Sequence, residues 1–472
     1  MAARSSFAAP PILQAARRLS WWTCVLAFAA CGQLKYENVG GAGQGVGGAA
    51  VGGAAGGMDG AAPSLSGSPL LFAPTSHGIG ISAALATGDP STLRARLRKT
   101  GATAWGTALV PESRAVDLAQ WDLEGLAGGT TYEYQISALG GGESALYQGR
   151  FVTARAPGAA FSFALVSDTH IGADLSYGNQ GDPTTLSTVS TAIGTAAPDF
   201  VVNLGDMLDF HEYGFNVPPP DGSVTRMAYL NYRRTFGDAV ANAAHFPVIG
   251  GWDSESGCNT LDEINRSRDQ RLLYLPGPSP QTYPEGGSPF QDYYAFTWGD
   301  ALFVVLNVYT YTPTCHLLSG DPGLADDWTL GDAQLAWLQN TLANATAKWR
   351  FLLIHHPVGG NAGDDDDSAY GRGGGRAAQV GQQALVHQLM QDHGVQILFY
   401  GHDHVFTDMT VDKTHYSLPG SAGAIWFFPT SQTGYTEDWE VPGWGKVDVT
   451  PGGVHVQYLD LTGQILYEYS LD

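Results

Sequence analysis

Residues 161–170 read FSFALVSDTH, an apolar run followed directly by polar residues that include Asp168 and His170. An apolar run of this length with phenylalanine and valine predicts a buried strand. Asp168 and His170 stand two positions apart, so both side chains can turn to one side as the chain leaves the strand. The stretch therefore predicts a strand that carries two ligand-type side chains at its carboxyl end.

The same arrangement of an apolar strand and a polar end recurs along the chain. Further examples are DFVVNLGDMLD (199–209), FPVIGGWD (246–253), ALFVVLN (301–307), RFLLIHHP (350–357) and VQILFYGHDH (395–404). Helical patterns lie between them, as in residues 331–345, and the chain after 405 becomes rich in strand patterns again. This alternation predicts a layered α/β domain that binds its ligands at the carboxyl ends of its strands.

Four of the predicted strand ends carry residue types that bind metal ions. They present Asp168 and His170, Asp206, His355 and His356, and His402 and His404. Each motif alone is weak, because Asp-x-His and Gly-Asp are common in surface turns. Four such strand ends meeting at one edge of a sheet predict a metal site, and imidazole and carboxylate ligands without thiolates suit Zn, Mn or Fe.

Four motifs follow one another along the chain: D-x-H (168–170), G-D-x-x-D (205–209), H-H-P (355–357) and G-H-D-H (401–404). In this order they resemble the calcineurin-like metallophosphoesterase superfamily over about 160–472. The resemblance implies a layered β-sandwich flanked by helices. It also implies metal-dependent hydrolysis of phosphate esters, of acid-phosphatase type, by a hydroxide that bridges two divalent or trivalent ions (Fe, Zn or Mn).

The resemblance assigns the ligands by position. Asp168, His170 and His404 would hold the first metal, Asp206 would bridge, and His355 and His402 would hold the second metal, with His356 as the substitute for His355. Purple acid phosphatases place a metal-binding tyrosine where this chain has Asp209, so the purple chromophore is not expected.

The loop at 250–253 departs from the family pattern. The family reads G-N-H-[DE] there, with the asparagine on the second metal and the histidine near the phosphate, whereas this chain reads Gly250-Gly251-Trp252-Asp253. Neither glycine nor tryptophan can ligate a metal or act as an acid at neutral pH. Either a carboxylate of the same loop (Asp253 or Glu255) or Ser254 reaches the second metal, or that ion is bound weakly with water in the gap.

Several questions about the reaction stay open. Proton donation would have to come from His211, from the second histidine of the H-H-P motif (His356) or from water, and Arg372 in a Gly-rich segment is a candidate contact for substrate phosphate. A phosphodiesterase is one alternative function. The other alternative is a degenerate, non-catalytic surface-binding protein with an incomplete metal site.

The N-terminal third predicts an exported protein with a separate all-β domain. Residues 1–31 resemble a bacterial secretory signal, and FAACG resembles a lipoprotein signal with Cys31 as the lipid-bearing residue. Residues 32–68 read as a Gly/Ala-rich flexible tether. Residues 69–156 resemble a fibronectin-III-like sandwich, with Leu126, Gly129 and Tyr132 placed as in a tyrosine corner, and purple-acid-phosphatase-like proteins have this layout. The expected location is the outer membrane, as a lipoprotein, or the periplasm or extracellular space.

Charge and cysteine content limit the partners. Asp and Glu total 45 against 23 Lys and Arg, for a net charge of −22, so nucleic acid binding is not expected. A small phosphorylated substrate remains compatible, because metal ions reverse the field locally. The membrane would be contacted only through Cys31. Cys258 and Cys315 would form one disulfide or remain free thiols.

Overall fold

The fold is described from a computed structural model, which covers residues 62–139, 144–175, 181–210, 222–255, 259–311, 329–358, 382–427, 435 and 437–472. Several predicted features lie outside these ranges: the signal segment 1–31 with Cys31, most of the tether, His211, Cys258, Cys315 and Arg372. The predicted tether ends earlier than residue 68, because strand β1 (Ser64–Leu65) already pairs with β3.

Two facing sheets form the centre of the domain that follows residue 160. In the first sheet, the parallel strands β9 (Phe161–Val166), β11 (Phe200–Asn203) and β13 (Ala244–Pro247) continue through the antiparallel strands β20 (Gly443–Val449), β21 (Val454–Asp460) and β22 (Ile465–Leu471). The second sheet has the order β14 (Tyr294–Trp298), β15 (Ala301–Val305), β16 (Trp349–Leu353), β17 (Ile397–Phe399), β19 (Thr414–Pro419) and β18 (Phe406–Val411).

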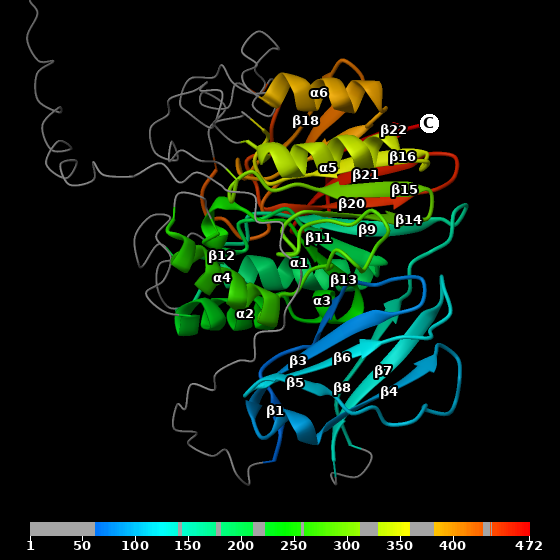
Figure 1. Ribbon diagram of the computed structural model, residues 1–472, viewed down its shortest axis with the longest axis vertical. Coiled ribbons are helices and arrows are strands. Elements are labelled where there is room, and N and C mark those ends of the chain that lie inside the picture. The colour runs from blue at the N-terminus through cyan, green and yellow to red at the C-terminus, as the bar shows by residue number, and fades with distance from the viewer. Residues whose placement is uncertain are drawn as a thin grey trace, which may run out of the picture. The chain divides into compact units, whose positions relative to one another are not determined.

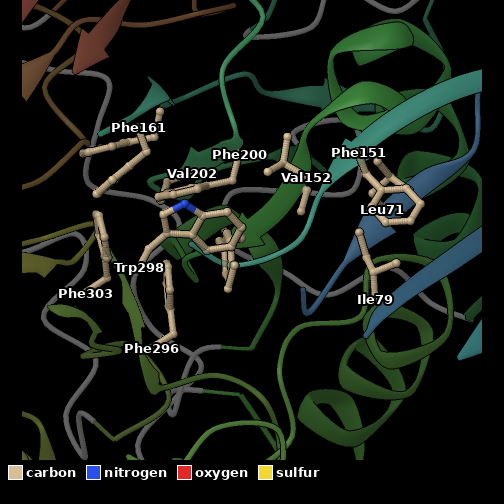
Figure 2. Close-up of a cluster of buried hydrophobic side chains, with 14 of the residues drawn as sticks. Leu71, Ile79, Phe151, Val152, Phe161, Phe200, Val202, Phe296, Trp298 and Phe303 are labelled. Atoms are coloured by element: carbon tan, nitrogen blue, oxygen red, sulfur yellow. The ribbon is translucent and has the colours of Figure 1, made fainter. Parts of the chain in front are cut away.

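An aromatic core fills the space between the two sheets. Phe163 stacks on Phe200 with ring centroids 5.2 Å apart, and Phe303 of the second sheet meets both rings edge-on. Figure 2 shows Phe200, Trp298 and Phe303 gathered in this cluster. Side chains of alternate residues point to one face of a strand, so the inward positions of the apolar runs interdigitate here.

Helices cover the outer face of each sheet (Figure 1). Helices α1 (Pro183–Ala196), α2 (Gly222–Phe236), α3 (Asp238–Asn242) and α4 (Leu261–Tyr274) lie on the side of the first sheet, and α5 (Gly331–Ala343) and α6 (Gln382–Asp392) lie on the side of the second. Helix α1 begins where Asp182 accepts hydrogen bonds from the Thr184 and Thr185 amides, with Pro183 in the first turn. The predicted layered β-sandwich flanked by helices is confirmed.

The N-terminal domain is a sandwich of short strands. Strands β1, β2 (Leu70–Phe72), β3 (Ile79–Thr87), β6 (Leu118–Leu123) and β5 (Glu112–Ala115) form one side, and β4 (Leu93–Lys99), β7 (Thr131–Ala138) and β8 (Ala145–Val152) form the other, with a 3-10 turn η1 (Pro90–Thr92). The Ala127 amide donates to the Tyr132 hydroxyl at 2.9 Å. The fibronectin-type assignment itself stays a prediction.

The N-terminal sandwich is joined to the following domain through buried contacts. Strand β2 pairs with β13, and the buried Tyr134 hydroxyl donates to the Ala241 carbonyl at 2.8 Å. Arg155 forms an ion pair with Asp199. None of the helices in the described ranges has both the length and the apolar character needed to cross a membrane.

Candidate metal centre

The predicted metal residues lie on loops that leave the carboxyl ends of β9, β11, β16 and β17. A short parallel pair, β10 (Ile171–Gly172) with β12 (Leu208–Asp209), holds the first two loops side by side, and the His170 amide donates to the Asp206 carbonyl at 3.0 Å. Five of the six residues have positive φ angles: Asp168 (54°), His170 (47°), Asp206 (50°), His402 (80°) and His404 (63°). Non-glycine residues rarely adopt this conformation, and clusters of it mark functional sites.

The first group of candidate ligands consists of Asp168, His170 and His404, all buried, with ligand atoms within 4.8 Å of one another. The two histidine Nε2 atoms are 3.2 Å apart, and Nε2 of His404 lies 3.4 Å from Oδ1 of Asp168. Ligand atoms about 2.1 Å from one metal ion stand roughly 3 Å from each other. The donor set and spacing therefore fit one ion.

The second group consists of Asp206, His355 and His402, again within 4.8 Å. Nε2 of His355 lies 3.1 Å from Oδ2 of Asp206 and 3.8 Å from Oδ1 of Asp168. The same Asp206 oxygen lies 3.9 Å from Nε2 of His170, which belongs to the first group. The two groups are thus adjacent, and Asp206 lies between them.

Outer hydrogen bonds orient the histidines. Nδ1 of His355 lies 2.8 Å from the Leu204 carbonyl oxygen, and Nδ1 of His404 lies 2.8 Å from the Trp426 carbonyl oxygen. Because a carbonyl only accepts, each Nδ1 carries a proton and each Nε2 faces the candidate site. Metal-ligating histidines are oriented in this way in general.

The field in the site favours a cation. Burial by itself raises the pKa of Asp168, but interactions with His404, His355 and His170 outweigh it and lower the pKa to about 2. Burial opposes protonation of His355, whereas Asp206 and Asp168 favour it, and its pKa rises to about 9. These carboxylates therefore hold a positive charge among them, which is the electrostatic requirement for a metal ion.

Two glycines allow the loops to approach closely. A Cβ at Gly205, whose φ is +105°, would lie 2.7 Å from Nδ1 of His355. A Cβ at Gly401 would lie 2.1 Å from Oγ of Ser167 and 3.1 Å from Oδ2 of Asp168. Any larger residue at these positions would displace the candidate ligands.

The G-G-W-D loop forms a buried 3-10 turn, η3 (Gly251–Asp253), and supports Asp206 from its backbone. The Trp252 amide donates to Oδ1 of Asp206 at 2.8 Å. Asp253 accepts from the amides of Met207 (3.0 Å), Leu208 (3.2 Å) and Gly250 (2.8 Å).

The carboxylates proposed as replacement ligands have other partners. Asp253 accepts hydrogen bonds from the three backbone amides just described. Glu255 makes a two-point ion pair with Arg271, at 2.5 and 3.1 Å. Neither belongs to either group of candidate ligands, so the expectation that one of them fills the gap gains no support here and stays a prediction. A carboxylate near a metal site pairs with whichever hydrogen-bond donors lie closest to it. The sequence alone does not show where those donors lie.

The remaining predicted residues have mixed positions. His356 is buried beside His402, with ring centroids 4.7 Å apart, but belongs to neither group. His211 and Arg372 lie outside the described residues. Two aromatic residues near the site, Trp426 and Tyr309, were not identified from sequence as part of it, whereas Trp252 lies in the loop at 250–253 that departs from the family pattern. Trp426 packs on His404 at 4.1 Å, Tyr309 faces His355 at 5.7 Å, and Trp252 meets His170 at 5.8 Å.

Comparison with known proteins identifies the family to which the chain belongs. The model of the calcineurin-like phosphoesterase family matches residues 161–406, more than half of the chain, and the chain belongs to this family. No curated protein sequence matches it. The fold is similar to that in a structure of PhoD (TM-score 0.60, 15% identity, covering 86% of this chain and 90% of that one). It is also similar to the purple acid phosphatase PPD1 from yellow lupin, Lupinus luteus (TM-score 0.61, 14% identity, covering 85% and 73%).

Proposed function

We propose that the chain hydrolyses phosphate esters at a two-metal site. The observation that carries this proposal is the adjacency of two three-residue ligand groups, built from four strand ends of a calcineurin-like phosphoesterase domain. Two ions bound there would act as Lewis acids on the phosphate and would make water a stronger nucleophile near neutral pH.

The protein's own residues have distinct roles in this proposal. Asp168, His170 and His404 would hold the first ion, and His355 and His402 would hold the second. Asp206, which lies between the two groups, would serve both. The backbone amide of Trp252 fixes Asp206, and carbonyl acceptors fix His355 and His404. The side chains of Trp252 and Trp426 border the first group, against His170 and His404.

The proposed reaction depends on the leaving group. With tryptophan at 252, that position cannot donate a proton to a departing alkoxide. His356 is a candidate for this role, because its ring lies beside that of His402. Esters whose leaving oxygen needs little protonation, such as aryl phosphates, are the expected better substrates, and both monoesters and diesters are candidates.

A hydrolysis assay tests the proposal. Purified protein is incubated with an aryl phosphate monoester and with the matching bis-aryl diester, with and without added Mn²⁺ or Zn²⁺, and after chelation. Metal-dependent release of phenol from either ester supports the proposal, and the preferred ester assigns mono- or diesterase activity. No turnover of either ester, in protein that carries two metals per chain, would favour a non-catalytic binding protein.

We also propose that the chain is exported and held at a membrane by a lipid on Cys31, since the N-terminal sequence resembles a lipoprotein signal. Labelling with a radioactive fatty acid, compared between wild type and Cys31→Ala, tests this. Label that persists in the variant would exclude Cys31 as the modified residue.

A further inference from the structure

The second group of candidate ligands is one short of a four-coordinate site. Asp206, His355 and His402 supply three protein atoms, and a four-coordinate ion would take one further donor, which in catalytic sites is usually water or substrate. Residue 251, on the loop that touches Asp206, is glycine and has no side chain to offer. The fourth donor therefore has to come from another element or from water.

Tyr309 occupies the space beside this glycine. A Cβ built on Gly251 would lie 3.0 Å from Cε1 of Tyr309, 3.3 Å from Cζ and 3.5 Å from the hydroxyl oxygen. The hydroxyl end of the ring thus lies where a short side chain from 251 would extend. A side chain at 251 would crowd the ring of Tyr309, which would have to give way by a few tenths of an ångström, because 3.0 Å is shorter than an ordinary carbon–carbon contact.

The ring of Tyr309 also faces the histidines of the site. It is 1% exposed, and its centroid lies 5.7 Å from that of His355 and 6.3 Å from that of His356. Tyr309 therefore lies close both to the glycine loop and to a candidate ligand of the second metal.

The backbone around Tyr309 is held rigidly. The buried Asn307 accepts hydrogen bonds from the amides of Tyr309 (2.9 Å) and Thr310 (3.3 Å). Thr310 in turn donates to the Glu255 carbonyl at 2.9 Å, which ties this turn to the loop that carries Gly251. Gln334 of α5 is bonded to both the amide and the carbonyl of Asn307. Ligands need such support to keep their geometry.

We propose that the phenolic oxygen of Tyr309 is a ligand of the second metal ion, together with Asp206, His355 and His402. This inference rests on the metal site proposed above. As the oxygen–metal bond forms, the phenol releases its proton to solvent, as other protonated ligands do when they bind a metal. A phenolate oxygen is a hard, anionic donor, so it favours a trivalent ion such as Fe³⁺ in this position over softer ions.

Visible absorption of the iron-loaded full-length chain tests this ligand. A phenolate bound to Fe³⁺ gives a ligand-to-metal charge-transfer band in the visible region, and resonance Raman excitation in that band gives tyrosine ring modes. Tyr309→Phe keeps the ring beside Gly251 and removes only the oxygen, so it should abolish the band and weaken one of the two ions at least tenfold. Tyr311→Phe is the matched control, because that hydroxyl donates to Asp292 at 3.1 Å, and it should keep both the band and the affinity.

The outcomes separate this inference from the function on which it rests. Wild-type protein that binds two Fe³⁺ ions without a visible band would overturn the tyrosine ligand alone. A Tyr309→Phe variant that keeps the band and binds both ions as tightly would do the same. Wild-type protein that binds no metal would overturn both. Resonance Raman of the wild type, labelled with ring-deuterated tyrosine, needs no variant, and a spectrum without shifted tyrosine modes would overturn the tyrosine ligand even if Tyr309→Phe does not fold.

Discussion

Replacing Asp253 with asparagine should weaken metal binding at Asp206 although Asp253 is not among the candidate ligands. Both Asp253 oxygens accept from backbone amides, two bonds at Oδ1 and one at Oδ2. These amides belong to Met207 and Leu208, directly after Asp206, and to Gly250, whose loop also donates the Trp252 amide to Asp206. Asp253 thus joins the two segments that shape the second metal site.

The size of the effect follows from the hydrogen bonds. In its better orientation, the asparagine keeps its oxygen toward Met207 and Leu208 and turns its NH₂ group toward the Gly250 amide, so one bond is replaced by a donor–donor contact. Leaving a buried amide donor without its acceptor costs about 1–3 kcal/mol. At 1.4 kcal/mol for each factor of ten, the expected loss of affinity is roughly 10- to 100-fold, as for other outer partners of metal ligands.

The assay is a competition titration of Zn²⁺ against a chromophoric chelator, which gives the number of sites and their affinities. Asp117→Asn is the matched control, because Asp117 is also a buried carboxylate, but it pairs with Arg226 and Tyr274. It should lose stability and keep both metal affinities. Unchanged affinities in Asp253→Asn would refute the reasoning, and equal losses in the two variants would show that the effect is not local.

Three further predictions concern other parts of the molecule. Trp252→His should raise the rate with an alkyl phosphate relative to an aryl phosphate by ~10²-fold, because it places a proton donor beside the first metal group; an unchanged ratio would contradict this. Burial, aided by the charge of Arg233, lowers the pKa of His245 to about 3, so the unfolded chain, with a histidine pKa near 6.5, binds the extra proton as the pH falls. The contribution of neutral His245 to the free energy of unfolding is therefore complete above pH 6.5 and is lost as the pH falls toward 3. Between pH 7 and pH 5, His245→Gln should lose about 2 kcal/mol less of its unfolding free energy than the wild type does. Denaturant titrations at the two pH values that show the same loss in both proteins would refute this. Tyr134→Phe leaves the buried Ala241 carbonyl without its donor, and denaturant unfolding should show a loss of about 1–2 kcal/mol, whereas a neutral variant would mean that this contact adds nothing to the junction of the two domains.

The sequence contains enough information to predict the layered fold and to select six residues that the structure brings together. Both follow from local pattern: apolar strands that end in Asp and His place these side chains at one edge, whatever the details of the loops. His355 rather than His356 lies against Asp206, with its Nε2 3.1 Å from Oδ2, and this choice is made by the bend that follows β16.

The roles of Asp253, Glu255 and Tyr309 could not be predicted in the same way. Asp253 and Glu255 lie in the right loop, but nearby backbone amides and the buried Arg271 bind their carboxylates. Tyr309 lies on a turn after β15 and follows Gly251 by 58 residues in the chain (309 − 251). Only tertiary packing brings the two residues together. The sequence pattern indicates that Gly251 replaces a metal ligand. In the structure, the absence of a side chain at Gly251 leaves space for the ring of Tyr309.

A metal-loaded crystal structure with anomalous scattering tests the central claim most directly. Crystals of the full-length chain grown with Zn²⁺ or Mn²⁺ should show two anomalous peaks, one among Asp168, His170 and His404 and the other among Asp206, His355 and His402. A single peak, or none, in protein with the fold intact would contradict a two-metal site and would favour a binding protein that has lost the chemistry of its family.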